Sequence, residues 1–134
     1  MKEFLHMGLN CNDISLIESF YCNFFGFRRE RVLKIDESEI VIISSGGFSL
    51  ELFQSDGKEP LPCPINDGYT HQSWRHICFM VDNLDAVIAE LGDQVRITLG
   101  PLDMGAVKPG MRICWVADPE GNIIELNQGY SDSE

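Results

Sequence analysis

The chain has 134 residues, enough for one domain or two small modules that share a core, and its 44% hydrophobic content is typical of a globular protein. Its 10 basic and 21 acidic residues give a net charge of −11, which argues against binding to nucleic acid or to an anionic membrane. No apolar run is long enough to span a membrane and the N-terminal stretch lacks a signal-peptide pattern, so we expect a cytoplasmic protein.

The first module is expected over residues 1–54. A strand-like run that starts at His6 leads into an amphipathic helix, which Asp13 would cap at its start and Gly26 would end. Three strand-like runs follow the helix: "RRERVLKI", "EIVIISS" and "FSLELFQ". This order of elements predicts a βαβββ module.

A second module with the same order is expected over residues 74–128, after a linker over 55–73 and before a tail over 129–134. The linker is rich in Pro, Gly and Asp and has no hydrophobic period. A strand-like run from His76 leads into a second helix, with Asp82 or Asn83 before it and Gly92 after it. The strand-like runs "QVRITLG", "MRICWVA" and "NIIELNQ" complete the module.

Five cysteines stand at positions 11, 22, 63, 78 and 114, widely spaced and without a CxxC pair. An odd number at such spacing predicts free thiols in a reducing compartment. Those at 78 and 114 fall in apolar strand-like runs, where a thiol serves as a small hydrophobic side chain.

A histidine begins each module and a glutamate lies in its last strand. His6 and His76 are 70 residues apart, and Glu51 and Glu125 are 74 apart. Such self-similarity at a nearly fixed offset indicates an internal repeat. The fold class predicted from it is α+β, built from two βαβββ modules.

Each glutamate interrupts an apolar strand, where an unpaired carboxylate is costly. Strand alternation places Glu51 with Ser49 and Phe53, and Glu125 with Ile123 and Asn127, on faces that are not wholly apolar. Taken singly, such a histidine is more often a hydrogen-bonded core residue, and such a glutamate is usually solvated.

The duplication favours a different interpretation, in which His6, Glu51, His76 and Glu125 together bind one divalent metal ion. The cation would supply the positive charge that makes two inward carboxylates tolerable. Nitrogen and oxygen ligands suit Ni²⁺, Zn²⁺, Co²⁺ or Mn²⁺, and the residues do not choose among these ions.

The words "FYCNFFGF" at the helix end and "DPEGNIIEL" before the last strand resemble the vicinal oxygen chelate superfamily, and the resemblance covers nearly the whole chain. Relatives in that superfamily include glyoxalase I, bleomycin-resistance proteins, methylmalonyl-CoA epimerase, fosfomycin-resistance enzymes and extradiol dioxygenases. The resemblance implies partly open, curved mixed sheets and a homodimer whose metal sites are assembled across two chains or two modules. The set His6, Glu51, His76 and Glu125 matches the glyoxalase I-like branch.

Two departures from that branch argue against a glutathione hemithioacetal as substrate. The stretch "MGLNCN" after His6 has no basic residue where an arginine is typical, and Ser55 stands where an asparagine is typical. Lys108, Arg112 and Trp115 are the candidates for substrate binding, and Arg75 is a further basic residue near the expected pocket.

The resemblance and the ligand set together predict a metal-dependent lyase or isomerase. It would act on a small molecule with vicinal oxygens through an enediolate. A glutamate that loosens from the metal would move the proton, with Glu125 as first choice and Glu51 as the alternative. A metal-free protein that binds or sequesters small molecules and an extradiol-type dioxygenase stay open as alternatives.

Overall fold

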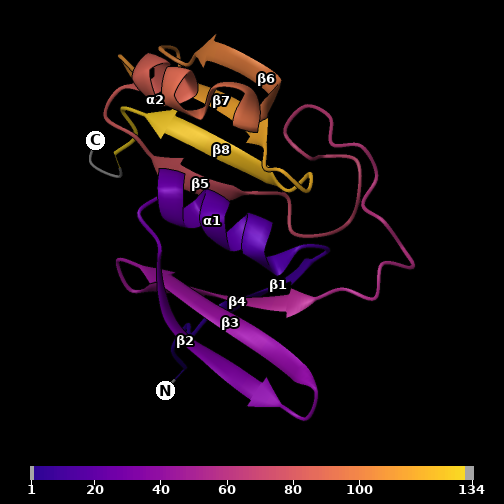
Figure 1. Cartoon of the computed structure of the whole chain (residues 1–134). Coiled ribbons are helices and arrows are strands. Elements are labelled where there is room, and N and C mark those ends of the chain that lie inside the picture. Colours follow the sequence, from indigo (N-terminus) through magenta and orange to yellow (C-terminus); the bar gives the residue numbers. More distant parts are fainter. Residues whose placement is uncertain (1, 132–134) are drawn as a thin grey trace. The chain divides into compact units, whose positions relative to one another are not determined.

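The computed structural model describes residues 2–131, which divide into two compact units (Figure 1). The first unit ends at Pro60 and the second begins at Leu61, so the boundary falls inside the predicted linker. Each unit contains one α-helix and one four-stranded sheet. The predicted tail over 129–134 extends past the described residues.

The first unit contains β1 (Met7–Cys11), α1 (Ile14–Phe24), β2 (Arg28–Ile35), β3 (Ser38–Ser45) and β4 (Phe48–Gln54). Its strand order is β1-β4-β3-β2, with β1 parallel to β4 and the other pairs antiparallel. Helix α1 begins where the Asp13 carboxylate accepts a hydrogen bond from the Leu16 amide at 3.0 Å, as a helix cap should.

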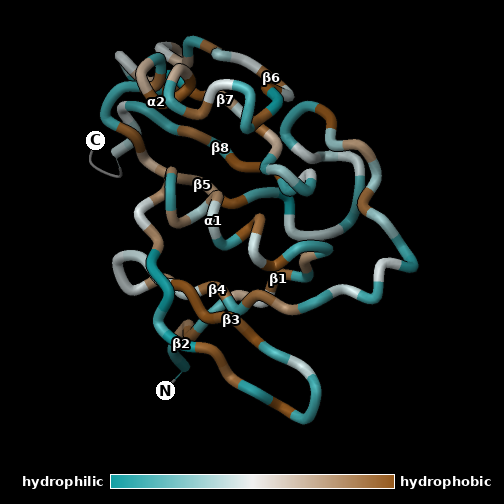
Figure 2. Tube along the Cα trace, viewed as in Figure 1, coloured by the Kyte–Doolittle hydropathy of each residue, from teal (hydrophilic) through white to brown (hydrophobic). Residues whose placement is uncertain are grey.

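One face of the first sheet forms the core of its unit together with α1. The helix buries Ile17, Phe20 and Tyr21, and the core strands contribute side chains that are at most 5% exposed, namely Val41, Ile43, Leu50 and Leu52. Figure 2 shows that hydrophobic residues concentrate in the strands and helices, whereas most of the connecting loops are hydrophilic. Because strand side chains alternate, Glu51 lies on the opposite face of the sheet from its buried neighbours.

The second unit contains β5 (Ile77–Met80), α2 (Leu84–Leu91), the 3₁₀ turn η1 (Gly92–Gln94), β6 (Arg96–Asp103), β7 (Arg112–Ala117) and β8 (Ile123–Gln128). Its order, β5-β8-β7-β6, repeats that of the first sheet. Asn83 caps α2 by accepting from the Ala86 amide at 3.0 Å, and the Gln128 side chain accepts from the Leu84 amide at 2.7 Å. The core under α2 includes Leu84, Ile124 and Leu126, each 0% exposed.

The predicted α+β fold of two βαβββ modules is therefore confirmed, and neither sheet closes into a barrel. Both first strands begin one residue later than predicted, after His6 and His76. The five cysteines are free thiols, and Cys78 is exposed rather than packed in the core. Among the described helices, none has the length and apolarity that a membrane span needs.

The later part of the linker is fixed to the second unit by specific contacts. Thr98 donates a hydrogen bond to the carbonyl of Asn66, and Arg75 pairs with Asp67 at 3.5 Å. Gly68 has a φ of +85°, and a Cβ added there would lie 2.7 Å from the carbonyl oxygen of Arg75. The chain around Asp67 and Gly68 is thus held directly against the residues that precede β5.

We expect Gly68→Ala to lower the free energy of unfolding by on the order of 3 kcal/mol, because it combines left-handed backbone strain with a steric clash. Gly57→Ala is a matched control, since Gly57 has a φ of +73° but nothing within 4 Å of an added Cβ. It should cost about 1 kcal/mol from backbone strain alone. Urea unfolding measures both values, and equal losses would contradict the close packing at Gly68.

Candidate functional site

In the first unit, His6 and Glu51 come together. His6 directly precedes β1, and Glu51 lies in the middle of the neighbouring parallel strand β4, opposite Gly8. His6 Nε2 lies 3.3 Å from Glu51 Oε2, and the glutamate side chain is only 17% exposed. A largely buried carboxylate is therefore met by an imidazole.

In the second unit, His76 and Glu125 form the corresponding pair. His76 directly precedes β5, and Glu125 lies on the parallel strand β8, opposite Cys78. His76 Nε2 lies 2.8 Å from Glu125 Oε2, with the glutamate side chain 14% exposed. Both modules thus place the same two groups at the same point of the same topology.

The spacing within each pair fits ligand atoms of a common metal ion. Nitrogen and oxygen ligands bind at about 2.0–2.2 Å, so neighbouring ligand atoms at right angles lie roughly 3 Å apart. The observed separations of 3.3 and 2.8 Å agree with that value. Within residues 2–131 the structure forms no group of three or more His, Cys, Asp and Glu side chains suited to a metal, so each module offers two donors.

His76 contacts a backbone carbonyl as well as Glu125. Its Nδ1 atom lies 3.5 Å from the carbonyl oxygen of Asp67, the kind of partner that fixes the other ring nitrogen of a metal-binding histidine. With Nδ1 donating, a neutral ring would present a lone pair to Glu125 at 2.8 Å. With the ring proton on Nε2 instead, His76 would donate to Glu125 directly.

The two glutamates differ in the hydrogen bonds that hold them. Asn127 Nδ2 donates to Glu125 Oε1 at 3.1 Å, and Cys78 lies directly opposite Glu125 on β5. Desolvation and the neighbouring Glu125 carboxylate raise the pKa of Cys78 to about 12, so the thiol stays protonated and can donate. Glu51 has no such donors, because Gly8 and Phe53 occupy the corresponding positions.

Trp115 lies on the same face of its sheet as Glu125, directly across from it on β7. It is 7% exposed and packs in an apolar cluster with Met111 and Ile113. Its indole Nε1 and Asn127 Oδ1 are buried polar atoms that have no hydrogen-bond partner within the described chain. Both atoms belong to side chains on the Glu125 face, and both are buried.

The predicted basic substrate contacts are not gathered at Glu125. Arg112 lies on the opposite face of β7 from Trp115, and its guanidinium bonds to both carboxylate oxygens of Asp85 in α2, at 2.9 and 3.0 Å. Lys108 donates to the carbonyl of Ser131 at 3.0 Å. Of the three predicted substrate contacts, only Trp115 shares a face with Glu125.

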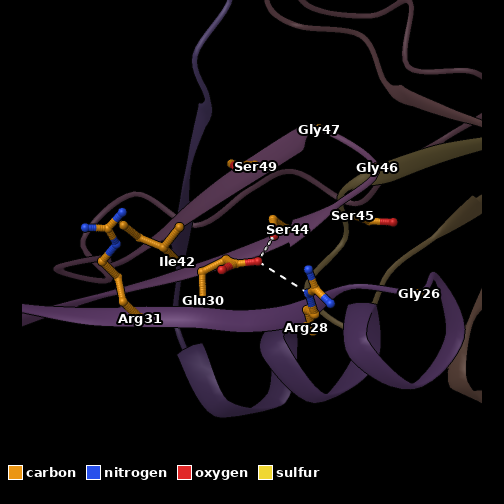
Figure 3. A pocket seen from close by; sticks show the side chains of 10 residues that line it. All are labelled: Gly26, Arg28, Glu30, Arg31, Ile42, Ser44, Ser45, Gly46, Gly47 and Ser49. Carbon is orange, nitrogen blue, oxygen red and sulfur yellow. Dashed lines mark hydrogen bonds and ion pairs between the residues drawn. The ribbon is translucent and has the colours of Figure 1, made fainter.

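A polar pocket of about 670 Å³ lies on the Glu51 face of the first sheet (Figure 3). Its lining includes Arg28, Glu30, Arg31, Ile42, Ser44 and Ser49. Strand pairing places Ile42 directly across from Glu51, and Ser49 precedes Glu51 by two residues on β4.

Strand alternation alone does not predict this pocket, because it puts Arg28 and Arg31 on opposite faces of β2. A bulge between Arg29 and Arg31 shifts the register, so Arg28 pairs with Ser44 and Arg31 with Ile42 on one face. The dense charge of "RRER" was the only available signal, and it does not reveal a bulge.

Known structures of similar fold cover nearly the whole chain. A glyoxalase family protein from Enterococcus faecalis is 26% identical, with a TM-score of 0.72, over 94% of this chain and 97% of its own. A trypanothione-dependent glyoxalase I from Leishmania major is 23% identical, with a TM-score of 0.69, over 96% and 87%. The fosfomycin resistance protein FosX from Listeria monocytogenes, complexed with Mn(II) and sulfate, is 17% identical, with a TM-score of 0.64, over 97% and 94%.

A search of curated proteins gave no match. The family model described as "Glyoxalase/Bleomycin resistance protein/Dioxygenase superfamily" matches residues 3–126. Because this match spans almost all of the chain and both His–Glu pairs, the chain belongs to the glyoxalase/bleomycin resistance protein/dioxygenase superfamily, the vicinal oxygen chelate group that its sequence resembles.

Proposed function

We propose that the protein is a divalent-metal-dependent lyase or isomerase that converts a small substrate with two neighbouring oxygens through an enediolate. The observation that carries this proposal is the repeated pair, His6 with Glu51 and His76 with Glu125, each with ligand-like spacing. Superfamily membership supports it, since the superfamily includes metal-dependent enzymes.

The two pairs would hold the ion, and their donor types fit it. Two carboxylates balance the charge of one divalent cation, and two imidazoles complete a four-ligand set that leaves room for substrate oxygens. When bound, the cation would polarise those oxygens and stabilise the negative charge that develops on them. Ni²⁺, Zn²⁺, Co²⁺ and Mn²⁺ all suit these donors, and Mn(II) is the ion in the complexed FosX structure.

The hydrogen bonds support Glu51 as the proton-transferring base, although the sequence favours Glu125. A base must turn from its resting position toward the substrate carbon, accept the proton and return it to the neighbouring carbon. Asn127 donates to the Glu125 carboxylate in addition to the contact with His76, whereas within residues 2–131 the contact of the Glu51 carboxylate is with His6, at 3.3 Å. Glu125 would act chiefly as a fixed ligand.

The alternatives are disfavoured for specific reasons. A protein that only sequesters small molecules has no need for two inward His–Glu pairs. The extradiol dioxygenases that the sequence resembles use three metal ligands, whereas this chain offers four candidates. Glutathione stays a doubtful substrate component, because "MGLNCN" after His6 carries no basic residue and Ser55 departs from the typical asparagine.

Exposed apolar side chains support the proposal of a homodimer. Phe4 and Trp74, each two residues before a metal-ligand candidate, are 68% and 86% exposed. These two side chains are therefore the candidates that we choose for testing a dimer contact.

Metal binding should be stoichiometric and should depend on both glutamates. We expect about one ion per chain after dialysis against Ni²⁺, Zn²⁺, Co²⁺ or Mn²⁺, measured by elemental mass spectrometry. Glu51→Ala or Glu125→Ala should each weaken binding by more than roughly 100-fold, since even outer-shell changes cost 10–100-fold. Glu39→Ala, which removes a half-exposed carboxylate paired with Lys34, is the control and should keep the metal. Unchanged metal content in all three variants would show that the pairs are simple ion pairs.

Glutamine replacements separate the two glutamate roles. With the hemithioacetal of methylglyoxal and a small thiol as substrate, Glu51→Gln should lower kcat by about 100-fold or more, because a general base is lost. Glu125→Gln should reduce metal affinity more than it reduces kcat of the metal-saturated protein. A larger kcat loss in Glu125→Gln with its metal retained would instead assign the base to Glu125.

Replacing Trp74 should weaken the dimer. Sedimentation velocity is expected to give a dimer for the wild type and a concentration-dependent mixture for Trp74→Ser, because a large apolar contact is removed. Leu61→Ser, which changes another exposed apolar residue in the linker (61% exposed), is the control. A wild-type monomer at micromolar concentration would overturn the dimer.

A further inference from the structure

The polar pocket of the first unit lies within reach of Glu51. Arg31, Ile42 and Glu51 are direct neighbours across three adjacent strands, β2, β3 and β4. Adjacent strands lie about 4.8 Å apart, so the backbones at Arg31 and Glu51 are separated by roughly 10 Å. A small molecule on this face could therefore contact both side chains.

Two of the three charged groups in the pocket are already engaged with each other. Glu30 accepts a hydrogen bond from Ser44 Oγ at 2.6 Å and lies 3.4 Å from Arg28 Nε (Figure 3). These contacts lower the pKa of Glu30, so its carboxylate is ionised at neutral pH. Arg28 is thus largely balanced by Glu30.

Arg31 acts on Glu30 through its charge and helps to lower the pKa of that carboxyl, but it makes no hydrogen bond to Glu30 as Arg28 does. Arg31 lines the same pocket, and none of the other residues in 2–131 forms a hydrogen bond or ion pair with it. In Figure 3 its guanidinium is drawn away from the Arg28–Glu30 contact. Two arginines and one glutamate leave the pocket with a net positive charge, in a chain whose total charge is −11.

We propose that this pocket is a subsite for a carboxylate on the substrate, with Arg31 as the residue that binds it. This inference rests on the proposed function, because it names the substrate class as a vicinal-oxygen compound that carries a carboxylate. A planar guanidinium matches a carboxylate through two parallel hydrogen bonds. Ser49 also lines the pocket, two residues before Glu51 on the same face of β4, and its hydroxyl is a further hydrogen-bond donor for the substrate carboxylate.

The charge balance favours a monoanion over a phosphate group. Because Arg28 already pairs with Glu30, the pocket offers one net positive charge, and Glu51 beside it would repel a dianion more strongly than a monoanion. One unpaired guanidinium neutralises one carboxylate. The pocket is an open depression on the sheet, so it would hold the carboxylate end of a substrate rather than enclose a whole molecule.

Binding of glutarate to the metal-free protein tests the subsite independently of the metal. In two-dimensional NMR spectra we expect glutarate to shift the amide signals of Ser44, Gly47 and Ser49. Arg31→Met should abolish the shifts and Arg31→Lys should retain part of them. Arg29→Met is the matched control, since Arg29 lies two residues away on the opposite face, bonded to Glu18 at 2.8 Å. No shifts in the wild type, or equal shifts in Arg31→Met, would overturn the subsite.

A second pair of probes links the subsite to the metal. Glutaric acid monohydroxamate and valerohydroxamate share a vicinal-oxygen chelating end and differ in having a carboxylate or a methyl group at the other end. On the metal-loaded protein, calorimetry should show that glutaric acid monohydroxamate binds about tenfold more tightly than valerohydroxamate, because its carboxylate forms a charge-assisted hydrogen bond. Arg31→Met should remove this difference, and Arg29→Met should keep it.

The outcomes of the two experiments separate the proposals. Equal binding of both hydroxamates to the wild type would overturn the carboxylate subsite and leave the metal site in place. Binding of neither hydroxamate would count against the metal site, while the glutarate titration would still decide the subsite.

Discussion

The structure depends on how each sheet accommodates a carboxylate in the middle of its last strand. Glu51 and Glu125 are 17% and 14% exposed, and each is flanked by residues of the hydrophobic core on its own strand. A charge so placed must be compensated. The topology provides a partner, because the first strand of each module runs parallel to the last and a histidine directly precedes that first strand. The βαβββ order therefore also brings the histidine and the glutamate of each module together.

Much of this arrangement could be predicted from sequence, because it follows from periodicity and repetition. Alternation placed each glutamate on the right face, the helix caps at Asp13 and Asn83 were readable, and the offset between the histidines revealed the repeat. Features that arise from tertiary contacts were not predictable. The engagement of Arg112 with Asp85 depends on how α2 packs on its sheet, and the bulge that turns Arg31 toward Ile42 leaves no mark in the alternation.

The two copies of the module surround their glutamates with different side chains. At the position two residues after each histidine, the first module has Gly8 and the second has Cys78, and an added Cβ at Gly8 would lie 3.3 Å from Phe53. The aromatic ring thus takes space that a donor side chain would need beside Glu51. In the second module, Cys78 and Asn127 fill the corresponding positions, and Asn127 donates a hydrogen bond to Glu125. The same module fold therefore holds the Glu125 carboxylate with an additional hydrogen bond and leaves the Glu51 carboxylate freer.

The buried polar atoms near Glu125 bear on whether the His76–Glu125 pair serves stability alone or belongs to a site that binds a ligand. A pair that served stability alone would be best surrounded by satisfied or apolar groups, since each unsatisfied buried polar group costs about 1–3 kcal/mol. Trp115 Nε1 and Asn127 Oδ1 have no partner within the described chain, and both belong to side chains on the Glu125 face. Unsatisfied groups are expected where a bound molecule completes the hydrogen bonds. Their position on the Glu125 face distinguishes the second His–Glu pair from a pair whose surroundings are fully satisfied.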